Sequence, residues 1–277
     1  MLLAPKKRPD HVWQAMKTAL TQNLLFNQAR GEAATGLAIM QQSGEVYIEK
    51  ASIPADNFVN TPAYTNLLQQ IGAQTTLLLG HTRNPTKGSP VNDHNNHPIE
   101  IGPVFGVHNG HIDNDDQLFQ SLNLPRQAEV DSEIIFRLLE PYSPQQLDGS
   151  YLVALQPNLS CMQGQFTFLA ADRRAADKLL VVKHQNPLSI YYHPQWAALI
   201  FSSSYIFLRK MFGPVVIHQT LPCDQLMHFK ATQLERLQHN PISIHPLFAK
   251  PCPNMGETVS EVDEHTSLYD EDTILIN

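Results

Sequence analysis

The sequence predicts an α+β protein with a largely antiparallel sheet. Segments with helical and strand-like patterns follow one another in blocks instead of alternating strictly, as they would around a parallel sheet. With 277 residues, of which 42% are hydrophobic and 16% charged, the chain can bury one large core.

The first predicted elements are a helix and a hairpin. Apolar residues from Val12 to Leu24 recur at spacings of three and four, which predicts an amphipathic helix over 10–29 with Asp10 as its cap. Residues 35–40 and 46–49 flank the sequence QQSGE, and this pattern predicts two strands joined by a tight turn.

The remaining elements are predicted from the same periodicities. We expect helices over 61–71, 115–122 and 131–139, and a polar loop over 81–102. Strand-like segments lie at 75–79, 104–107, 151–155, 166–170, 179–182 and 198–202.

Charge and composition exclude several kinds of partner. The net charge of −7 arises in the last residues, 256–277, and the rest of the chain carries equal numbers of acidic and basic side chains. No basic surface for nucleic acid is therefore expected, and we predict an acidic, disordered tail over 251–277. No long apolar stretch predicts a membrane span or signal peptide, which favours a cytoplasmic protein without membrane contact.

The sequence contains three widely spaced cysteines: Cys161, Cys223 and Cys252. Their odd number and their spacing predict thiols rather than a disulfide framework or a metal site.

The densest group of polar residues lies between residues 80 and 116. The stretches GHTRNPTKGS, NNHP and VHNGHIDN each follow or end a predicted strand, which predicts a site there. Taken singly, Arg83 would be interpreted as part of an ion pair, and Asn109-Gly110 as a hairpin turn.

Taken in order, these motifs resemble those of class II glutamine amidotransferases, which are N-terminal-nucleophile hydrolases. The resemblance covers roughly residues 10–210 and implies a four-layer α/β/β/α sandwich of that type over residues 1–250. The motifs are Arg30-Gly31, Gly80-His81-Thr82-Arg83, Asn96-His97-Pro98, His108-Asn109-Gly110 and Asp131-Ser132-Glu133. Weaker echoes continue in Leu147-Asp148-Gly149-Ser150, Asn186-Pro187-Leu188 and Phe201-Ser202-Ser203.

The resemblance also implies roles in binding L-glutamine and in hydrolysing it to glutamate and ammonia. Arg83 would bind the α-carboxylate and Asp131 the α-amino group. Asn109 and the backbone N–H of Gly110 would form the oxyanion hole. Thr86 and His108 occupy two further substrate-binding positions. The aromatic residue that often follows the arginine is replaced by Asn84, so the flap over the site is expected to differ.

The nucleophile implied by the resemblance, an N-terminal cysteine, does not occur at residue 1. Met1 has a thioether that can neither lose a proton nor attack an amide. Two explanations stay open: a start a few residues too late in the expected first strand, or a glutamine-binding pseudoenzyme or scaffold. No cofactor is implied, and the ammonia acceptor would be a separate synthetase or transferase subunit.

A metal-dependent hydrolase is the alternative from another enzyme class. His94 and His97, and again His108 and His111, have the spacing HxxH, and imidazoles are zinc ligands. Both pairs fall in predicted loops or turns rather than on a helix, which favours a protein without metal.

Overall fold

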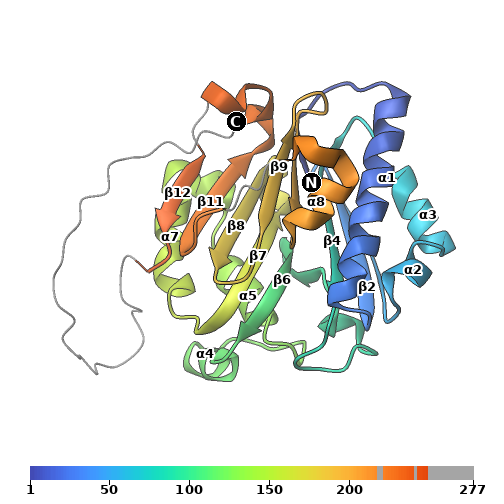
Figure 1. Cartoon of the computed structure of the whole chain (residues 1–277). Coiled ribbons are helices and arrows are strands. Elements are labelled where there is room, and N and C mark those ends of the chain that lie inside the picture. The colour runs from blue at the N-terminus through green and yellow to red at the C-terminus, as the bar shows by residue number, and fades with distance from the viewer. Residues whose placement is uncertain (217–220, 240–241, 249–277) are drawn as a thin grey trace.

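Two six-stranded antiparallel sheets form the centre of the molecule (Figure 1). The structure is a computed structural model that describes residues 1–216, 221–239 and 242–248. The predicted tail at 251–277 lies outside these residues.

The first sheet has the strand order β3-β2-β4-β1-β10-β9. Its strands are β1 Leu2–Leu3, β2 Ala34–Gln41, β3 Val46–Ala51, β4 Thr75–Arg83, β9 Ser189–His193 and β10 Ala198–Ser202. The second sheet has the order β12-β11-β8-β7-β6-β5. It consists of β5 Ile99–Ile101, β6 Val104–Ile112, β7 Gly164–Asp172, β8 Lys178–His184, β11 Gln225–Lys230 and β12 Ser243–Pro246.

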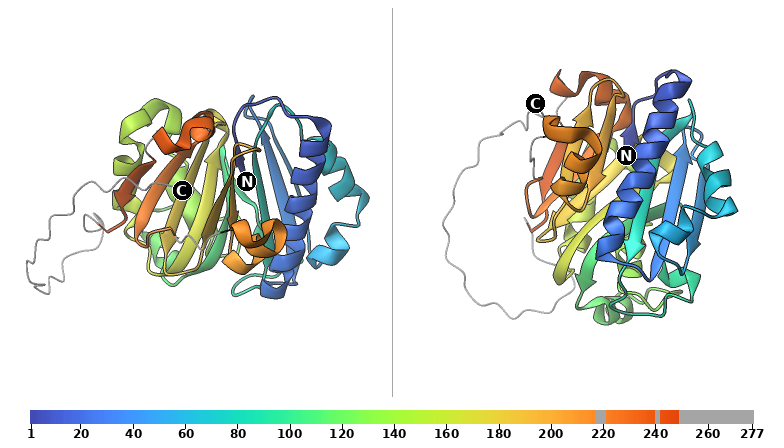
Figure 2. Two further views of the ribbon diagram at one scale, coloured as in Figure 1. Left: turned by 45° about the horizontal axis from the view of Figure 1, so that its top comes forward. Right: turned by 45° about the vertical axis from the view of Figure 1, so that its right-hand side comes forward.

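Helices cover the outer face of each sheet, so the fold is the predicted four-layer α/β/β/α sandwich (Figure 2). The first sheet is covered by α1 Asp10–Asn27, α2 Ala55–Phe58, α3 Pro62–Gln69 and α8 Tyr205–Phe212. The second is covered by α4 Asp115–Ser121, α5 Glu133–Leu139, α6 Pro144–Leu147 and α7 Tyr151–Leu159. One apolar core lies between each sheet and the helices that cover it, and a third lies between the two sheets.

One predicted strand is wrong, because residues 151–155 begin helix α7. Tyr151, Leu152, Leu155 and Leu159 are buried, at the spacing of one helix face. A short apolar run fits a buried strand and a buried helix equally well, and here the packing against α5 and β12 decides.

Two further details differ from the prediction. Asp10 is the first residue of α1, and Pro9 holds the N-cap position without a side-chain cap. Asn109 and Gly110 lie inside β6, paired with Thr167 and Phe166 of β7, so the hairpin-turn interpretation is wrong.

The predicted strands over 75–79 and 104–107 are longer in the structure and end at Arg83 and Ile112. Their polar second halves were not recognised as strand. These halves carry the residues of the site described below.

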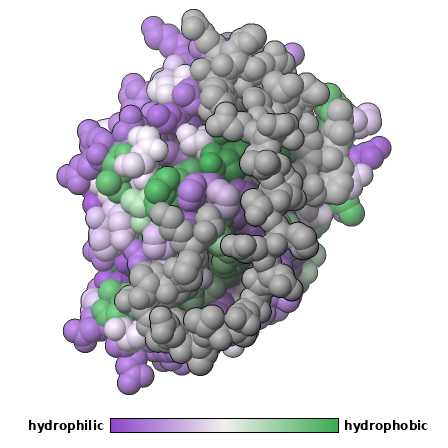
Figure 3. All heavy atoms as spheres, turned by 90° about the vertical axis from the view of Figure 1, so that its left-hand side faces the viewer, coloured by the Kyte–Doolittle hydropathy of each residue, from purple (hydrophilic) through white to green (hydrophobic). Residues whose placement is uncertain are grey.

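The side of the molecule with α7 and β12 shows groups of hydrophobic residues among hydrophilic ones (Figure 3). Val153 in α7 and Phe248 after β12 are exposed apolar side chains. Within the ranges that the structure describes, no helix has the length and apolarity needed to span a bilayer.

Candidate functional site

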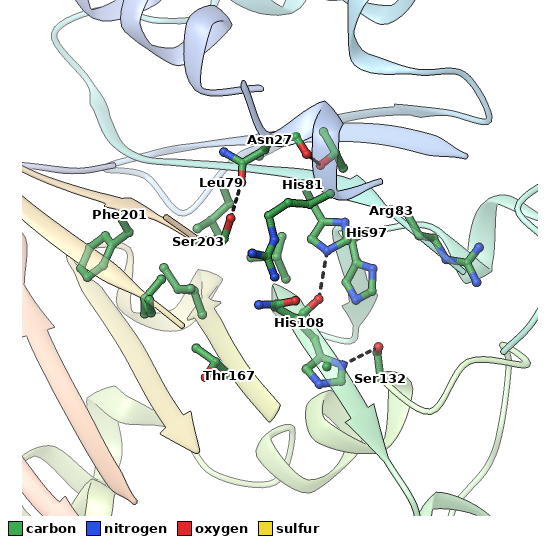
Figure 4. A pocket seen from close by; sticks show the side chains of 18 of the residues that line it. Asn27, Leu79, His81, Arg83, His97, His108, Ser132, Thr167, Phe201 and Ser203 are labelled. Carbon is green, nitrogen blue, oxygen red and sulfur yellow. Dashed lines mark hydrogen bonds between the residues drawn. The ribbon is translucent and has the colours of Figure 1, made fainter. Parts of the chain in front are cut away.

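A cavity of about 370 Å³ lies between the two sheets and gathers all six predicted site residues. Residues of β4, β6 and the segment before α5 line it, and α1, β7 and β10 complete its wall (Figure 4). The six residues are Arg83, Thr86, His108, Asn109, Gly110 and Asp131.

Asn109 presents an unpaired donor in this cavity. Its Nδ2 is buried and has no hydrogen-bond partner among the residues that the structure describes. A buried amide nitrogen without an acceptor costs free energy, about 1–3 kcal/mol, unless a ligand supplies the acceptor. The geometry therefore favours a bound group with an oxygen at this place.

Gly110 can be replaced by no other residue without a clash. Its φ is +130°, and a Cβ would lie 1.8 Å from the carbonyl oxygen of Gln165. Glycine lets β6 pass close to β7 while continuing the strand.

Asn186 fixes the peptide between Asn109 and Gly110. Its Nδ2 donates to the carbonyl oxygens of Asn109, at 2.9 Å, and of Gln165, at 2.8 Å. Because the peptide is planar and trans, holding the Asn109 carbonyl also fixes the direction of the Gly110 N–H. The weak motif Asn186-Pro187-Leu188 thus supplies a positioning residue that the sequence analysis did not recognise.

Arg83 is buried and binds the loop that follows it. Its Nη1 donates to Oδ1 of Asn96 at 2.9 Å, and its Nη2 donates to the carbonyl oxygens of Lys87 and Gly88 at 2.7 and 2.9 Å. Burial lowers the pKa of Arg83, and the nearby Asp131 raises it again. The guanidinium group, which we expect to bind a carboxylate, therefore already donates three hydrogen bonds within the protein. Two of them go to the loop after β4 that contains Thr86, Lys87 and Gly88, which we call the flap.

Arg30 is a second cation on the cavity wall. It ends the 3-10 turn Gln28–Arg30 after α1, and its side chain makes no hydrogen bond or ion pair within the described part of the chain. The sequence signal was present in the motif Arg30-Gly31, but no role was assigned to it. Its guanidinium is therefore available to bind an anion.

Asp131 lies 5% exposed just before α5. Its Oδ2 accepts a hydrogen bond of 2.7 Å from the backbone N–H of Ile112, and burial raises its pKa. The preceding segment is held by the buried Glu133, which accepts from the N–H groups of Gln127 and Ala128 and from Nε of Arg137. A positive group in the cavity would stabilise the Asp131 carboxylate.

The flap that contains Thr86 is tied to α4 by charge. Nζ of Lys87 lies 2.7 Å from Asp115 and 2.8 Å from Asp116, and Arg126 binds the same two carboxylates. Thr86 itself is exposed at the rim of the cavity.

Comparisons of sequence and of structure both find similarity to glutamine-dependent transferases. Glutamine–fructose-6-phosphate aminotransferases are similar in sequence: that of Halalkalibacterium halodurans is 29% identical over 181 residues, which is 63% of this chain and 28% of the relative. The enzyme of Pyrococcus horikoshii is 27% identical over 68% of this chain and 29% of its own length. The chain therefore spans less than a third of these curated relatives. No protein-family profile matches it.

Among solved structures, the glutamine phosphoribosylpyrophosphate amidotransferase from B. subtilis superposes with a TM-score of 0.60. The match covers 86% of this chain and 47% of that one, at 15% identity. The chain is similar in sequence to class II glutamine amidotransferases and has their fold. This agrees with the resemblance and with the N-terminal-nucleophile hydrolase type of sandwich.

Three histidines line the cavity together: His97 and His108 are buried, and His81 is partly buried. The rings of His81 and His97 lie 4.3 Å apart, and those of His97 and His108 6.4 Å apart. Nε2 of His81 donates to the carbonyl oxygen of His108, and Nδ1 of His108 bonds Oγ of Ser132 (Figure 4). Neither ring nitrogen of His97 has a partner among the described residues.

Burial keeps these imidazoles neutral. It lowers the pKa of His81 to about 4 and that of His108 to about 3, and it holds the pKa of His97 well below its usual value. Neutral rings suit donation or acceptance of hydrogen bonds, not binding of an anion by charge.

The histidines predict how stability depends on pH. Unfolding frees them to bind protons below their ordinary pKa of 6.5, whereas the folded state does not bind them until about pH 4 or below. The free energy of unfolding should thus fall as the pH drops below about 6.5, by up to about 1.4 kcal/mol per pH unit for each histidine. Urea unfolding near pH 8 and near pH 5 measures this.

His97→Phe is the informative variant, because the ring nitrogens that it removes have no partner. It should keep the stability of wild type near pH 8 and lose less than wild type near pH 5. His94→Phe, at an exposed imidazole, is the matched control and should follow the wild-type curve. An unchanged slope in His97→Phe would contradict the assignment.

The metal-site alternative gains no support from the positions of the HxxH pairs. His97 and His108 are buried, whereas His94 and His111 are exposed. In each HxxH pair, one histidine is therefore in the interior and the other on the surface. Across the described ranges no group of three or more metal-ligating side chains occurs.

The expectation of a thiol at Cys161 is wrong, because this cysteine is disulfide-bonded. Sequence spacing does not show which cysteines meet in space. Cys161 also lies in the core beneath the second sheet, away from the cavity between the sheets.

Proposed function

We propose that this domain binds L-glutamine in the cavity between its sheets. The observation that supports this best is the buried Nδ2 of Asn109, which has no partner among the described residues and lies next to Gly110, whose positive φ suits glycine. A glutamine side chain would bring the missing acceptor, its amide oxygen. The same donor would stabilise the oxyanion of a tetrahedral intermediate if the amide were attacked.

The two ends of the amino acid have matching charges in the cavity. Asp131 would bind the α-amino group, and the guanidinium groups of Arg30 and Arg83 would bind the α-carboxylate. Arg83 retains Nε and one N–H of Nη1 beyond its contacts with the flap. Thr86 and His108 would contact the ligand from the flap and from β6.

Hydrolysis requires a nucleophile, and the alternation of residues along β1 supports one place for it. Met1 pairs with Leu78 through two backbone hydrogen bonds, and the residue borders the cavity. Residues alternate along β1: Leu2 and Ala4 face the core between the sheets, whereas Met1 and Leu3 face the helices. One residue placed before Met1 would lie opposite Leu79 and face the space between the sheets.

We therefore propose that a form of the chain with cysteine directly before Met1 hydrolyses glutamine through a thioester to glutamate and ammonia. The α-amine of that cysteine would serve as the general base. The ammonia would pass to an acceptor on another chain, and residues 1–250 would form the glutamine domain.

A second candidate function is glutamine binding without hydrolysis, as in a sensor or scaffold. It is favoured for the polypeptide that starts at Met1, because a thioether cannot attack an amide.

Calorimetric titration with L-glutamine tests the binding proposal. Binding should be weak and selective, and D-glutamine should bind less tightly because its amino and carboxylate groups exchange places relative to Asp131 and the arginines. Equal heats for the two enantiomers, or none for L-glutamine, would refute binding in this cavity.

A further inference from the structure

A buried lysine and an exposed cysteine lie in contact outside the lining of the cavity. Nζ of Lys183, in β8, is 2.7 Å from Sγ of Cys223. Lys183 is only 6% exposed, whereas Cys223 is a free cysteine on the surface. Solvent therefore reaches the sulfur while the amine is shielded behind it.

The contact is unusual in two respects. Buried lysines are normally paired with carboxylates, yet within the described ranges the Cys223 sulfur is the partner of Nζ. The separation is that of an N–H···O bond, although sulfur is the larger atom. Nitrogen and sulfur are thus close enough for one small atom to bridge them.

The backbone holds the two residues in register. The N–H of Asp224 donates to the carbonyl oxygen of Lys183 at 2.7 Å, and Gln225 pairs with Lys183 in the ladder between β8 and β11. Cys223 therefore has little freedom to move away from the amine. Proximity of this kind favours a reaction between the two groups over a reaction with other molecules.

We propose that Lys183 and Cys223 form an oxidative cross-link in which one oxygen atom joins Nζ to Sγ. A first molecule of hydrogen peroxide oxidises the Cys223 thiol to a sulfenic acid and is reduced to water. A second takes two electrons and two hydrogens as the N–O bond forms, one hydrogen from the amine and one from the sulfenic acid, and yields two waters. The product is N–O–S, and thiol reductants return it to amine, thiol and water.

The cross-link would join β8 to the segment just before β11, across 40 positions of the sequence. Closing a loop stabilises a protein mainly by restricting its unfolded chain. The oxidised form should unfold at a higher urea concentration than the reduced form, and thiol reductant should reverse this shift.

Peptide mass spectrometry of the full chain tests the proposal. Treatment with hydrogen peroxide should join the peptides containing Lys183 and Cys223, at their combined mass plus one oxygen and minus two hydrogens, and reductant should separate them. Lys183→Met and Cys223→Ser should each abolish the joined species. Circular dichroism would verify that both variants are folded.

Other products would overturn the proposal. These are a sulfinic or sulfonic acid at Cys223 with no joined peptide, a disulfide from Cys223 to another cysteine, a link without the additional oxygen, or no reaction. Since Lys183→Met could disturb a buried position, the mass of the wild-type product decides the question even if that variant does not fold.

Discussion

Addition of one cysteine before Met1 should convert an inactive polypeptide into a glutaminase. The chain that starts at Met1 is expected to release no ammonia from glutamine, because no thiol or hydroxyl stands at its first residue. With initiator methionine removed, the extended chain would begin at cysteine, continue β1 opposite Leu79, and direct its thiol between the sheets. Ammonia release measured with each form tests this.

The alternation of β1 provides matched controls. A chain that begins Cys-Gly before Met1 should be far less active. Its cysteine lies two positions before Met1, so its side chain points to the same side of β1 as that of Met1, toward the helices. Serine in place of the added cysteine should also abolish most activity. In the active form, Asn109→Ala should lower kcat by about 10²–10³-fold, the usual loss for one oxyanion-hole donor. If both cysteine extensions were inactive in a folded protein, glutamine binding without hydrolysis would be the better account.

Loss of the Asp131 charge should weaken L-glutamine binding by about 10- to 100-fold, the usual range for a hydrogen bond to a charged group. Asp131→Asn is the appropriate variant, because an amide oxygen can still accept from the N–H of Ile112. Calorimetry compares it with wild type. Asp113→Asn, at an exposed carboxylate outside the cavity, is the control and should bind as wild type does. Equal affinities in all three proteins would contradict the assignment of Asp131.

The contribution of each arginine can be separated with a modified ligand. Glutamine whose α-carboxylate has been converted to an amide lacks the negative charge that a guanidinium would bind. Arg30→Ala should therefore weaken L-glutamine binding but leave binding of the amide unchanged. Arg83→Ala should weaken both, because it also removes three hydrogen bonds to Asn96, Lys87 and Gly88 of the flap.

The pattern of the sequence predicted an antiparallel α+β fold, and the family resemblance predicted its four layers and the residues that line the cavity. The ends of the strands were predicted less well. The GHTR and HNG motifs were placed in or next to loops because they are polar, yet they lie in β4 and β6, where one face borders a cavity instead of a core. Polar residues at the end of a buried strand are thus compatible with the strand when a ligand site lies beside them.

Contacts between distant segments could not be predicted. Asn186 binds the carbonyl of Asn109 across 77 positions, and the Lys87 ion pairs join the flap to a helix that follows it by almost thirty residues. Such contacts depend on how the sheets stack, and local periodicity contains no information on that. The hydrogen bonds from Arg83 to Asn96, Lys87 and Gly88 could not be predicted from the sequence for the same reason.

The position of β1 also constrains the order in which the protein can assemble during synthesis. Leu2 is fully buried and pairs both with Leu77 of β4 and with Leu199 of β10, so this short strand joins two otherwise separate parts of the first sheet. The second pairing cannot form until the ribosome has produced residue 199, long after the N-terminus has emerged. Pairings this distant slow folding and leave apolar segments exposed in the meantime. Residues 1–4, buried in the finished domain, would therefore be exposed to chaperones for most of translation.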